Sequence, residues 1–283
     1  MAQQEPPFAL ITGCSSGIGK ALATTFASKG ITVLATARRT ESLASLITTH
    51  PNIEAFPLTL DDPKSIEALK DAITERTGGR LDYLVNNAGT HYAAMGLDLE
   101  MDRVATLFQV NVFAVMRLCQ MFTPHLRKSG RGRIVQIGSV TRDVPVVWQG
   151  AYNATKAALS QYSKTLRLEL APFNVEVVEV VTGFVQSNLL SDGLIAPEGT
   201  LYLPIKPTIE DIKLGGNKNG MSAESFAKSV VDTLLRKRGT LEIWEGGSAR
   251  FLRWVVNLLP LRLFNWILFR RFKLGLLTSS NKR

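Results

Sequence analysis

A phenol and an ammonium group stand four residues apart in the segment Tyr152-Asn153-Ala154-Thr155-Lys156. On a helix these two side chains are neighbours on one face. An unperturbed Tyr has a pKa near ~10, too high for ready proton donation at neutral pH, and a fixed cation beside it is expected to lower that pKa. Ser139, at the end of the preceding predicted strand, is placed to hydrogen-bond the same substrate oxygen. Because a Tyr and a Lys four apart occur by chance in many helices, this pair predicts acid–base catalysis only together with further motifs.

A glycine-rich segment, Thr12-Gly13-Cys14-Ser15-Ser16-Gly17-Ile18-Gly19, lies between the first predicted strand and the first predicted helix. Glycines at such a turn let the backbone approach a pyrophosphate, and the helix N-terminus supplies amide hydrogens and positive potential. The pattern predicts a dinucleotide site in which Gly13, Ser15, Ser16 and Ile18 contact the cofactor. The alternative is a tight turn without a ligand, which its position at the start of the fold disfavours.

The end of the second predicted strand indicates which dinucleotide fits. An acidic residue there would bind the ribose hydroxyls of NAD, whereas this strand ends in Ala37-Arg38-Arg39. Guanidinium groups match phosphate oxygens, so Arg38 and Arg39 predict the 2′-phosphate of NADP as their partner and NADPH as the cofactor. The alternative for this pair is a solvated basic turn.

The elements that must position these groups follow from the hydrophobic pattern. Short apolar runs bounded by turn residues predict strands, and apolar residues at helical spacing predict helices. Their alternation indicates an α/β fold, a single Rossmann-type doubly wound parallel sheet with helices on both faces. The predicted strands are 8–12, 31–37, 53–58, 81–85, 133–137, 175–181 and 241–244, and the predicted helices are 17–30, 65–76, 101–126 and 152–170.

Composition sets further bounds. The chain has 283 residues, 45% apolar and 20% charged, which is typical of a globular α/β domain; we place that domain at residues 1–248. Residues 186–220 are rich in Gly, Pro and Asn and are predicted to form a long irregular insertion that shapes a substrate site. The two cysteines, Cys14 and Cys119, indicate no disulfide framework and favour a reducing compartment. Residues 1–7 lack the features of a secretory signal.

Most of the net charge of +9 lies in residues 250–283, which hold eight basic residues and no acidic one. Removing these eight charges leaves the first 249 residues at +1. Large apolar residues alternate with the tail charges, which suits a membrane surface better than a phosphate backbone, so no nucleic-acid partner is predicted. We predict that residues 249–283 form a membrane-associating tail that contacts a membrane or lipid droplet through residues 250–277.

The tail is expected to lie on a membrane and not to cross it as one span. A spanning helix needs about 20 mainly apolar residues, but within 251–277 the longest uncharged runs, 254–261 and 263–269, have eight and seven. Pro260 also breaks or kinks any helix at the middle. The expected forms are a helical hairpin in one leaflet or an interfacial segment whose arginines reach the headgroups. The alternative is an arm packed on a partner subunit in a homodimer or homotetramer.

The motifs occur together in the order and spacing of the short-chain dehydrogenase/reductase family, which residues 8–248 resemble. The resemblance implies a Rossmann domain and hydride transfer between a nicotinamide and a carbonyl or alcohol. The matching segments are Thr12-Gly13-x-x-x-Gly17-x-Gly19, Asn86-Asn87-Ala88-Gly89, Asn111, Ser139 and Tyr152-x-x-x-Lys156.

The resemblance also implies residue roles. Tyr152 would be the proton donor, and Lys156 would bind the nicotinamide ribose and tune Tyr152. Ser139 would orient the carbonyl, and Asn111 would hold a water in the proton relay. The further cofactor contacts that it implies are Asn87, which lines the cofactor site, and Val185 and Ser187 at the nicotinamide end.

Two positions depart from the family pattern. The family's Pro-Gly after the sixth strand is Thr182-Gly183 here, so the turn should survive with a less rigid backbone. The aspartate often found near the adenine aligns with Thr59, and the sequence leaves open whether Asp61 or Asp62 replaces it.

Within the family the chain is similar to the fungal NADPH-dependent 1-acyldihydroxyacetone-phosphate reductases. This implies an NADP-dependent carbonyl reductase of that acylated ketone or a similar lipophilic one, at the cytoplasmic face of the endoplasmic reticulum membrane or on a lipid droplet. Ketoreductases of fungal specialised metabolism and sterol or retinoid reductases share the core and stay open as alternatives. The similar segments are Ala37-Arg38-Arg39, Pro172-Phe173-Asn174-Val175, Thr182-Gly183 and Arg271-Phe272-Lys273-Leu274.

The sequence also permits two other classes of protein, which its motifs favour less. Gly13-Cys14-Ser15-Ser16-Gly17 fits the G-x-S-x-G pattern of lipid hydrolases, but that chemistry needs a histidine and an acid beside the serine. The three histidines, His50, His91 and His125, form no evident triad in the sequence. A sensor or scaffold without turnover would have lost the catalytic Tyr or Lys, and this chain has both.

Several remaining residues have two readings each. A substrate phosphate is one possible partner for four basic residues, and solvation on a mobile loop is the favoured alternative. His91 either edges the substrate pocket or is a partly exposed loop residue. No metal site is predicted. The four basic residues are Arg142, Lys206, Lys213 and Lys218.

Overall fold

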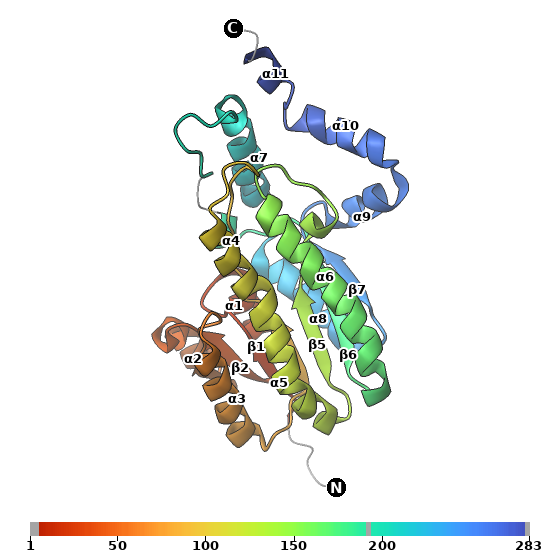
Figure 1. The fold of residues 1–283 in the computed structure, drawn as a ribbon. Coiled ribbons are helices and arrows are strands. Elements are labelled where there is room, and N and C mark those ends of the chain that lie inside the picture. The colour runs from red at the N-terminus through yellow and green to blue at the C-terminus, as the bar shows by residue number, and fades with distance from the viewer. Residues whose placement is uncertain (1–5, 191–193, 281–283) are drawn as a thin grey trace.

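A computed structural model describes residues 6–190 and 194–280 of the chain (Figure 1). Its centre is a parallel sheet of seven strands in the order β3-β2-β1-β4-β5-β6-β7. The strand order reverses between β1 and β4, where open α/β sheets bind their ligands. The expected Rossmann-type doubly wound sheet is confirmed. The strands are β1 (Phe8–Ile11), β2 (Thr32–Ala37), β3 (Ile53–Pro57), β4 (Tyr83–Asn86), β5 (Arg133–Ile137), β6 (Glu176–Thr182) and β7 (Glu242–Glu245).

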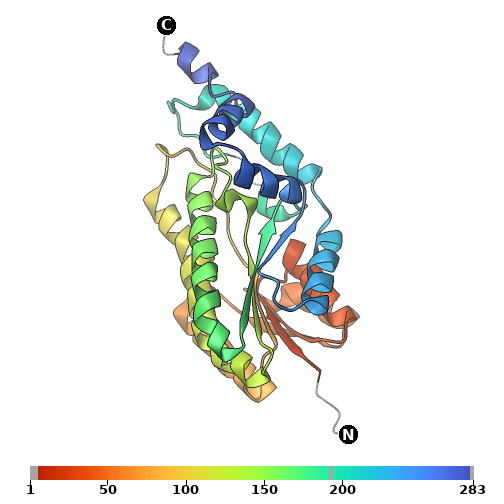
Figure 2. The same ribbon diagram turned by 90° about the vertical axis from the view of Figure 1, so that its right-hand side faces the viewer.

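Helices cover both faces of this sheet (Figures 1 and 2). On one face α1 packs against α8 over strand residues such as Val33 and Val178. On the other face α3, α5 and α6 bury apolar side chains against Leu10, Leu34 and Ile134. Successive strand residues point to opposite faces, so apolar runs supply both interfaces. These helices are α1 (Gly17–Ser28), α2 (Ala44–Thr49), α3 (Pro63–Thr77), α4 (Met101–Phe108), α5 (Ala114–Ser129), α6 (Gly150–Leu170) and α8 (Ala223–Arg236).

Each predicted strand lies within two residues of an observed one, but the helices differ more. The helix predicted over 101–126 continues to Ser129 and contains a π-helical turn, Gln109–Phe113, between α4 and α5. Met101–Ser129 is long and apolar enough to cross a membrane, yet Leu118 and Phe122 are buried in the core, as in the core helix of a globular domain. Helix α8 was not predicted.

The prediction of a wholly irregular insertion at 186–220 is wrong for its second half. Lys206–Lys218 forms a helix, α7, with Pro207 in the first turn, where proline is tolerated. Gly216 lies where a Cβ would overlap the ring of Phe184, so this glycine permits close helix packing and does not mark a loop. Residues 191–193 of the insertion lie outside the described residues.

The chain after β7 forms three helices at the end of the molecule where the strands finish (Figure 1): α9 (Ala249–Leu258), α10 (Leu261–Arg271) and α11 (Leu276–Ser280). Pro260 separates α9 from α10, as expected from its break of the helix. Ala249, Phe264 and Phe272 are buried against the domain. The tail is therefore packed on the body along part of its surface.

The turn after β6, at Thr182-Gly183, is held by close contact with the end of β7. The amide of Gly183 donates to the carbonyl oxygen of Glu245 at 2.8 Å, and a Cβ at Gly183 would overlap the carbonyl oxygen of Gly247. The adjoining Gly246 has φ of +100°, which favours glycine. The backbones of the β6 and β7 ends thus approach so closely that only glycine fits at position 183.

We expect Gly183→Ala to destabilise the fold by about 1–3 kcal/mol, the usual effect of overpacking, because neither backbone can move freely. Thermal unfolding followed by circular dichroism measures the change. Gly215→Ala is the matched control: it lies in α7 with open space at its Cβ, so it should be neutral or stabilise by up to about 1 kcal/mol. Equal losses in both variants would contradict the close-approach argument.

Candidate active site

The carboxyl ends of β4, β5 and β6 bring the predicted catalytic residues together. Ser139 follows β5 by two residues and caps a short 3-10 helix, Val140–Arg142, by accepting a hydrogen bond from the amide of Thr141. Tyr152 and Lys156 occupy successive turns of α6, and both are buried. Ser139 and the Tyr152 phenol are hydrogen-bonded, and the Lys156 ammonium lies 5.7 Å from the centre of the Tyr152 ring. The helical spacing seen in the sequence therefore yields a compact trio.

Burial governs the acidity of Tyr152. It raises the pKa of the phenol to about 12, and the hydrogen bond with Ser139 opposes that rise. The expected lowering of the Tyr152 pKa is therefore wrong for the protein without cofactor. The physical reason is that burial of the phenol outweighs its hydrogen bond with Ser139, while the Lys156 ammonium donates to the carbonyl oxygen of Ile137 at 2.9 Å.

Lys156 is itself a buried cation. Burial lowers the pKa of its ammonium to about 8, and the negative charge of Glu179 counteracts that shift. Glu179 is fully buried on β6 and accepts a hydrogen bond at 2.9 Å from Ser160, one helical turn after Lys156. The charge state of Lys156 therefore depends on a carboxylate behind the catalytic helix.

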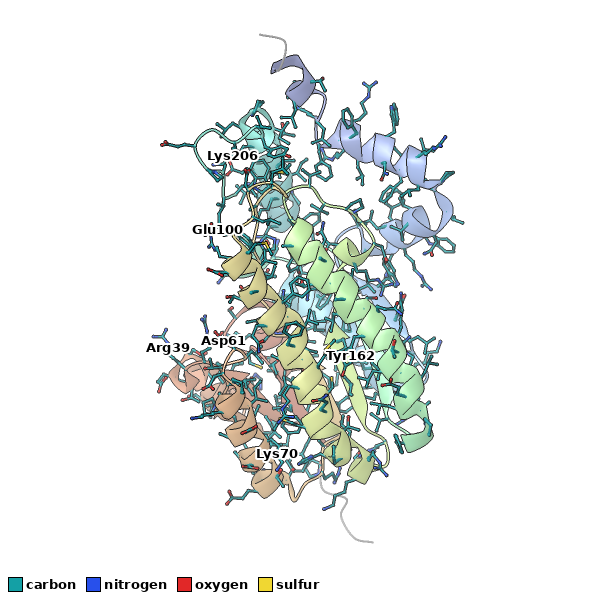
Figure 3. All side chains as sticks on the ribbon, in the orientation of Figure 1. Arg39, Asp61, Lys70, Glu100, Tyr162 and Lys206 are labelled. Atoms are coloured by element: carbon teal, nitrogen blue, oxygen red, sulfur yellow. The ribbon has the colours of Figure 1, made fainter. Side chains whose placement is uncertain are left out.

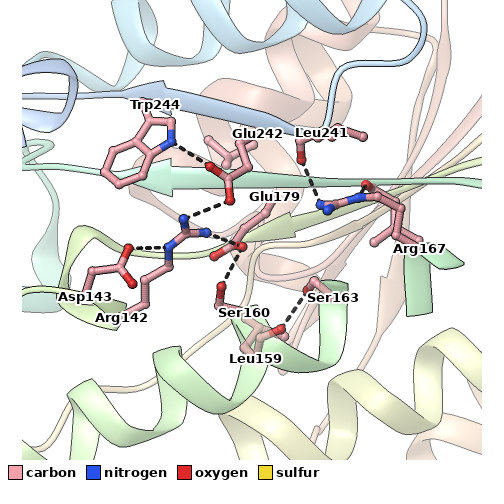
Figure 4. Close-up of polar contacts among 12 residues, drawn as sticks. Arg142, Asp143, Leu159, Ser160, Ser163, Arg167, Glu179, Leu241, Glu242 and Trp244 are labelled. Carbon is pink, nitrogen blue, oxygen red and sulfur yellow. Dashed lines mark hydrogen bonds and ion pairs between the residues drawn. The ribbon is translucent and has the colours of Figure 1, made fainter. Parts of the chain in front are cut away.

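Arg142 holds that carboxylate in place (Figure 4). Its guanidinium, only 5% exposed, forms ion pairs with Glu179, with Asp143 at 2.8 Å and with Glu242 at 2.8 Å. It also lies over the ring of Trp244 at 5.1 Å. Arg142 is thus neither a solvated charge nor free to hold a substrate phosphate, because each of its three guanidinium nitrogens is paired with a carboxylate.

Asn111 lies in the π-helical turn before α5. Its side-chain oxygen accepts from the amide of Thr90, and its side-chain nitrogen donates to the carbonyl oxygen of Thr90, both at 2.9 Å. The nitrogen also lies 3.2 Å from the hydroxyl of Thr155, between Tyr152 and Lys156 in α6. Asn111 thus ties the segment after β4 to α6.

The glycine-rich turn follows β1 and opens α1, as predicted. Gly13 and Gly17 have φ of +74° and +53°, and a Cβ at Gly19 would overlap the carbonyl oxygen of Gly13. Asn87 holds this turn, because its side-chain nitrogen donates to the carbonyl oxygens of Thr12 at 2.8 Å and Gly13 at 3.2 Å. Asn87 therefore shapes the cofactor turn from behind.

The geometry of this turn fits a dinucleotide pyrophosphate. Ser16 is the N-cap of α1, but its side chain makes no capping hydrogen bond, and Ser15 and Ser16 are exposed. The first amides of α1 are thus left without a side-chain acceptor, and the helix dipole favours an anion at that position. Ile18 is half-buried and packs against the core cluster under α1.

The predicted adenosine end lies at the ends of β2 and β3. Arg38 and Arg39 are exposed directly after β2, and Arg39 projects from the surface (Figure 3). Asp62 is the N-cap of α3 and accepts a hydrogen bond from the amide of Lys64 at 2.9 Å, so its side chain already has a structural role. Asp61 is exposed beside it.

The segment after β6 reaches back over the glycine-rich turn. A Cβ at Gly17 would lie 3.3 Å from the Cβ of Ser187, while Val185 is buried and bridges to Met221. Asn217 of α7 fixes Ser187, exchanging two hydrogen bonds of 3.1 Å with its backbone. Sequence reasoning missed Asn217, because only the helical state of α7 directs its side chain here.

The segment before α6 and the insertion close over the catalytic end. Trp148 is buried with φ of +71°, and its indole donates to the carbonyl oxygen of Ile195 at 3.0 Å. Ala94 bridges to both Gln149 and Ile195. Trp148 was not singled out in the sequence, although a bulky residue in a left-handed conformation often marks a functional segment.

The remaining basic residues and histidines that the sequence analysis named lie at separate places in the fold. Lys206 lies 3.7 Å from Glu210, Lys213 is buried and Lys218 is exposed. The ring of His91 packs on Tyr152 at 4.9 Å between centroids, so His91 lies beside the predicted proton donor. His125 is hydrogen-bonded to Thr74, between α5 and α3.

Comparison with known proteins assigns the family. Residues 7–193 match the family model of short chain dehydrogenases. A short-chain dehydrogenase of Pyricularia oryzae is 36% identical over 279 residues, covering 97% of both chains. The NADPH-dependent 1-acyldihydroxyacetone phosphate reductase of Schizosaccharomyces pombe is also 36% identical, covering 91% of both. The crystal structure of a short-chain dehydrogenase from Streptomyces avermitilis superimposes with a TM-score of 0.81 at 31% identity, covering 95% of this chain and 98% of that one. The chain therefore belongs to the short-chain dehydrogenase/reductase family, oxidoreductases that act on alcohol and ketone groups.

Proposed function

We propose that this protein is an NADPH-dependent reductase of a lipophilic ketone, with 1-acyldihydroxyacetone phosphate as the substrate to test first. The observation that carries the proposal is the trio of Ser139, Tyr152 and Lys156 at the strand ends, beside a glycine-rich turn that fits a pyrophosphate. The hydrolase alternative is set aside, because Ser15 belongs to that turn in a family of oxidoreductases.

The protonation state of the trio supports reduction. With a pKa of about 12, Tyr152 carries its proton at neutral pH, as a proton donor must, although without cofactor it is a weaker acid than a free tyrosine. Ser139 is placed to hydrogen-bond the same oxygen, and the buried setting excludes water that would compete for it. NADPH, when bound, supplies the hydride that the carbonyl carbon accepts. The positive charge of Lys156 stabilises the phenolate that proton donation leaves on Tyr152.

The choice of NADPH rests on Arg38 and Arg39. They follow β2 with no carboxylate at Ala37, and neither guanidinium forms an ion pair with a described residue. Both are therefore free to pair with a 2′-phosphate. The Schizosaccharomyces pombe relative is NADPH-dependent by name, which agrees with this choice.

The substrate proposal rests on apolar surroundings and on that relative. The residues around the insertion form an apolar cluster at the catalytic end, which suits an acyl chain or another lipophilic group. Of the four basic residues considered for a substrate phosphate, Lys218 is exposed and forms no ion pair with a described residue. A screen of the purified protein with NADPH should therefore compare acyl-dihydroxyacetone phosphate with steroid, retinal and polyketide ketones. The cluster contains Ala93, Met95, Trp148, Leu194, Ile205, Ile209 and Phe272.

Tyr152→Phe should lower kcat by about 10²–10⁴-fold while leaving NADPH affinity nearly unchanged, because it removes the proton donor and little else. Steady-state kinetics and cofactor titration measure the two effects. Tyr162→Phe, a second tyrosine on the same helix, is the control and should keep most of the activity (Figure 3). A loss below tenfold in Tyr152→Phe counts against this residue as the acid.

Arg38→Ala should weaken NADPH binding by about 1.5–3 kcal/mol, the scale of a charge-assisted contact, and leave NADH binding nearly unchanged. Fluorescence titration with both cofactors measures the difference. Arg236→Ala removes an equal charge from α8 and serves as the control. Equal weakening of NADPH and NADH by Arg38→Ala would refute the phosphate contact.

Glu179→Gln should shift the pH profile of kcat/KM. With a pKa of about 8, Lys156 loses its charge as pH rises through that value, so activity should fall on the alkaline side. Glu179 raises the Lys156 pKa, so removing its charge lowers that pKa and moves the alkaline limb to lower pH. Arg142, Glu242 and Lys164, which also face Glu179, keep their charges.

Glu245→Gln, at another buried carboxylate on β7, is the control and should leave the alkaline limb in place. Circular dichroism of both variants establishes that each is folded. An unmoved limb in a folded Glu179→Gln variant would show that Glu179 does not set the charge of Lys156.

A further inference from the structure

Helices α9 and α10 carry a surface that the fold of the domain leaves uncovered. On α9, Phe251, Trp254 and Leu258 are 68%, 66% and 70% exposed and lie on one face, at i, i+3 and i+7. On α10, Trp266 and Phe269 are also exposed. Large exposed apolar patches are uncommon in proteins whose surface meets only water. We call this set of five side chains the aromatic face.

The aromatic face is held rigidly by the opposite sides of the same helices. Leu252, Val255 and Val256 of α9 pack against a cluster that contains Val181 and Trp244. On α10, Phe264 is buried in that cluster, and Leu268 packs against it. The exposed aromatic side chains therefore belong to folded helices with a fixed orientation.

Positive charge borders the aromatic face. Arg253 lies beside it on α9, and Arg262, Arg270 and Arg271 lie on α10, all exposed. The guanidinium of Arg270 lies over the ring of Trp266 at 5.4 Å. Residues 250–283 contain no acidic residue. A face of tryptophan, phenylalanine and leucine edged by arginine matches the boundary between headgroups and acyl chains of an anionic lipid surface.

We propose that the aromatic face of α9 and α10 docks this protein on an anionic lipid surface, lying in the interface without crossing it. The helices have 10 and 11 residues and are separated by Pro260, whereas a membrane span needs about 20 residues. A second copy of the chain fits this face less well, because a symmetric pair would place arginines against arginines without an acidic residue between them.

The docked orientation has a consequence for the substrate. Side chains of the tail, including Leu268, Phe272 and Leu277, pack in the same apolar cluster as Trp148 and Leu194 of the catalytic end. Figures 1 and 2 place α9–α11 at the end of the sheet where the strands finish. A lipid surface bound there lies next to the catalytic end, so a membrane-dissolved ketone has a short path to Tyr152. This consequence rests on the proposed function; the docking itself does not.

Flotation of the purified full chain tests docking without any catalytic readout. Vesicles of phosphatidylcholine with about 30% phosphatidylserine provide a simple anionic lipid surface for this test. The wild-type protein should float with them at low salt and float less as salt screens the charges. The triple variant Phe251→Ser, Trp254→Ser, Trp266→Ser should stay in the soluble fraction.

Two matched controls separate docking from general loss of surface groups. Leu168→Ser, an equally exposed leucine on α6, should float like the wild type. Arg262→Gln with Arg271→Gln should weaken partitioning by about fivefold for each charge removed. Lys64→Gln with Lys237→Gln, the same charge change on exposed residues elsewhere, should have little effect.

Two flotation results would overturn docking. Wild-type protein that stays soluble with anionic vesicles, or a folded triple variant that floats equally well, refutes it. If the wild type is an oligomer that does not float and the triple variant is a monomer, the aromatic face binds a second copy of the chain and docking is refuted. Substitution is preferred to deletion of the tail, because Ala249, Phe264 and Phe272 are buried and their loss would expose the domain.

A kinetic comparison then tests substrate delivery separately. Anionic vesicles should raise the turnover of a ketone dissolved in them by several-fold in the wild type and not in the triple variant, while both reduce a water-soluble ketone equally. Flotation without this difference keeps docking and refutes delivery. Inactivity toward every ketone, with normal flotation, refutes the proposed function and leaves docking intact.

Discussion

The hydrogen bond from the Lys156 ammonium to the carbonyl oxygen of Ile137 joins α6 to the end of β5. The catalytic geometry depends on it, because Tyr152 lies one turn before Lys156 and Ser139 lies two residues after Ile137. A buried ammonium needs compensating charge. Glu179 supplies it from β6; burial raises the pKa of Glu179, and its ion pair with Arg142 opposes that rise. The negative charge of Glu179, which is paired with Arg142, thus favours the charged form of Lys156.

Much of this arrangement is encoded locally and could be predicted. The pattern of apolar residues predicted where the strands of the Rossmann sheet lie along the chain, and helical spacing predicted that Tyr152 and Lys156 are neighbours. The direction of the Tyr152 pKa could not be predicted, because it depends on burial by segments that approach only in the folded chain. Arg142 resembled a solvated cation for the same reason: its partners Glu179 and Glu242 lie 37 and 100 residues away.

The insertion was harder to predict because glycine has two uses. In the turn after β1, Gly13 takes up a left-handed conformation, as a glycine-rich loop suggests. In α7, Gly216 instead removes a side chain so that the helix can lie against Phe184. Composition cannot separate these uses, and the position of Asn217 over Ser187 depends on the second. The segment around Ser187, where the family resemblance implies the nicotinamide, is therefore held by a helix that the sequence pattern conceals.

The same tertiary logic links the tail to the catalytic serine. The turn that begins at Ser139 continues through Val140 and Val144, whose side chains are buried in the cluster that Leu252 and Val255 of α9 join. Arg142, between those valines, carries the ion pair to Glu179. One side of α9 thus braces the turn that orients Ser139, while its other side presents Phe251 and Trp254 to the surroundings. Helix α9 thus has two apolar sides: one packs beside the turn that carries Ser139, and the other forms part of the outer surface of the protein.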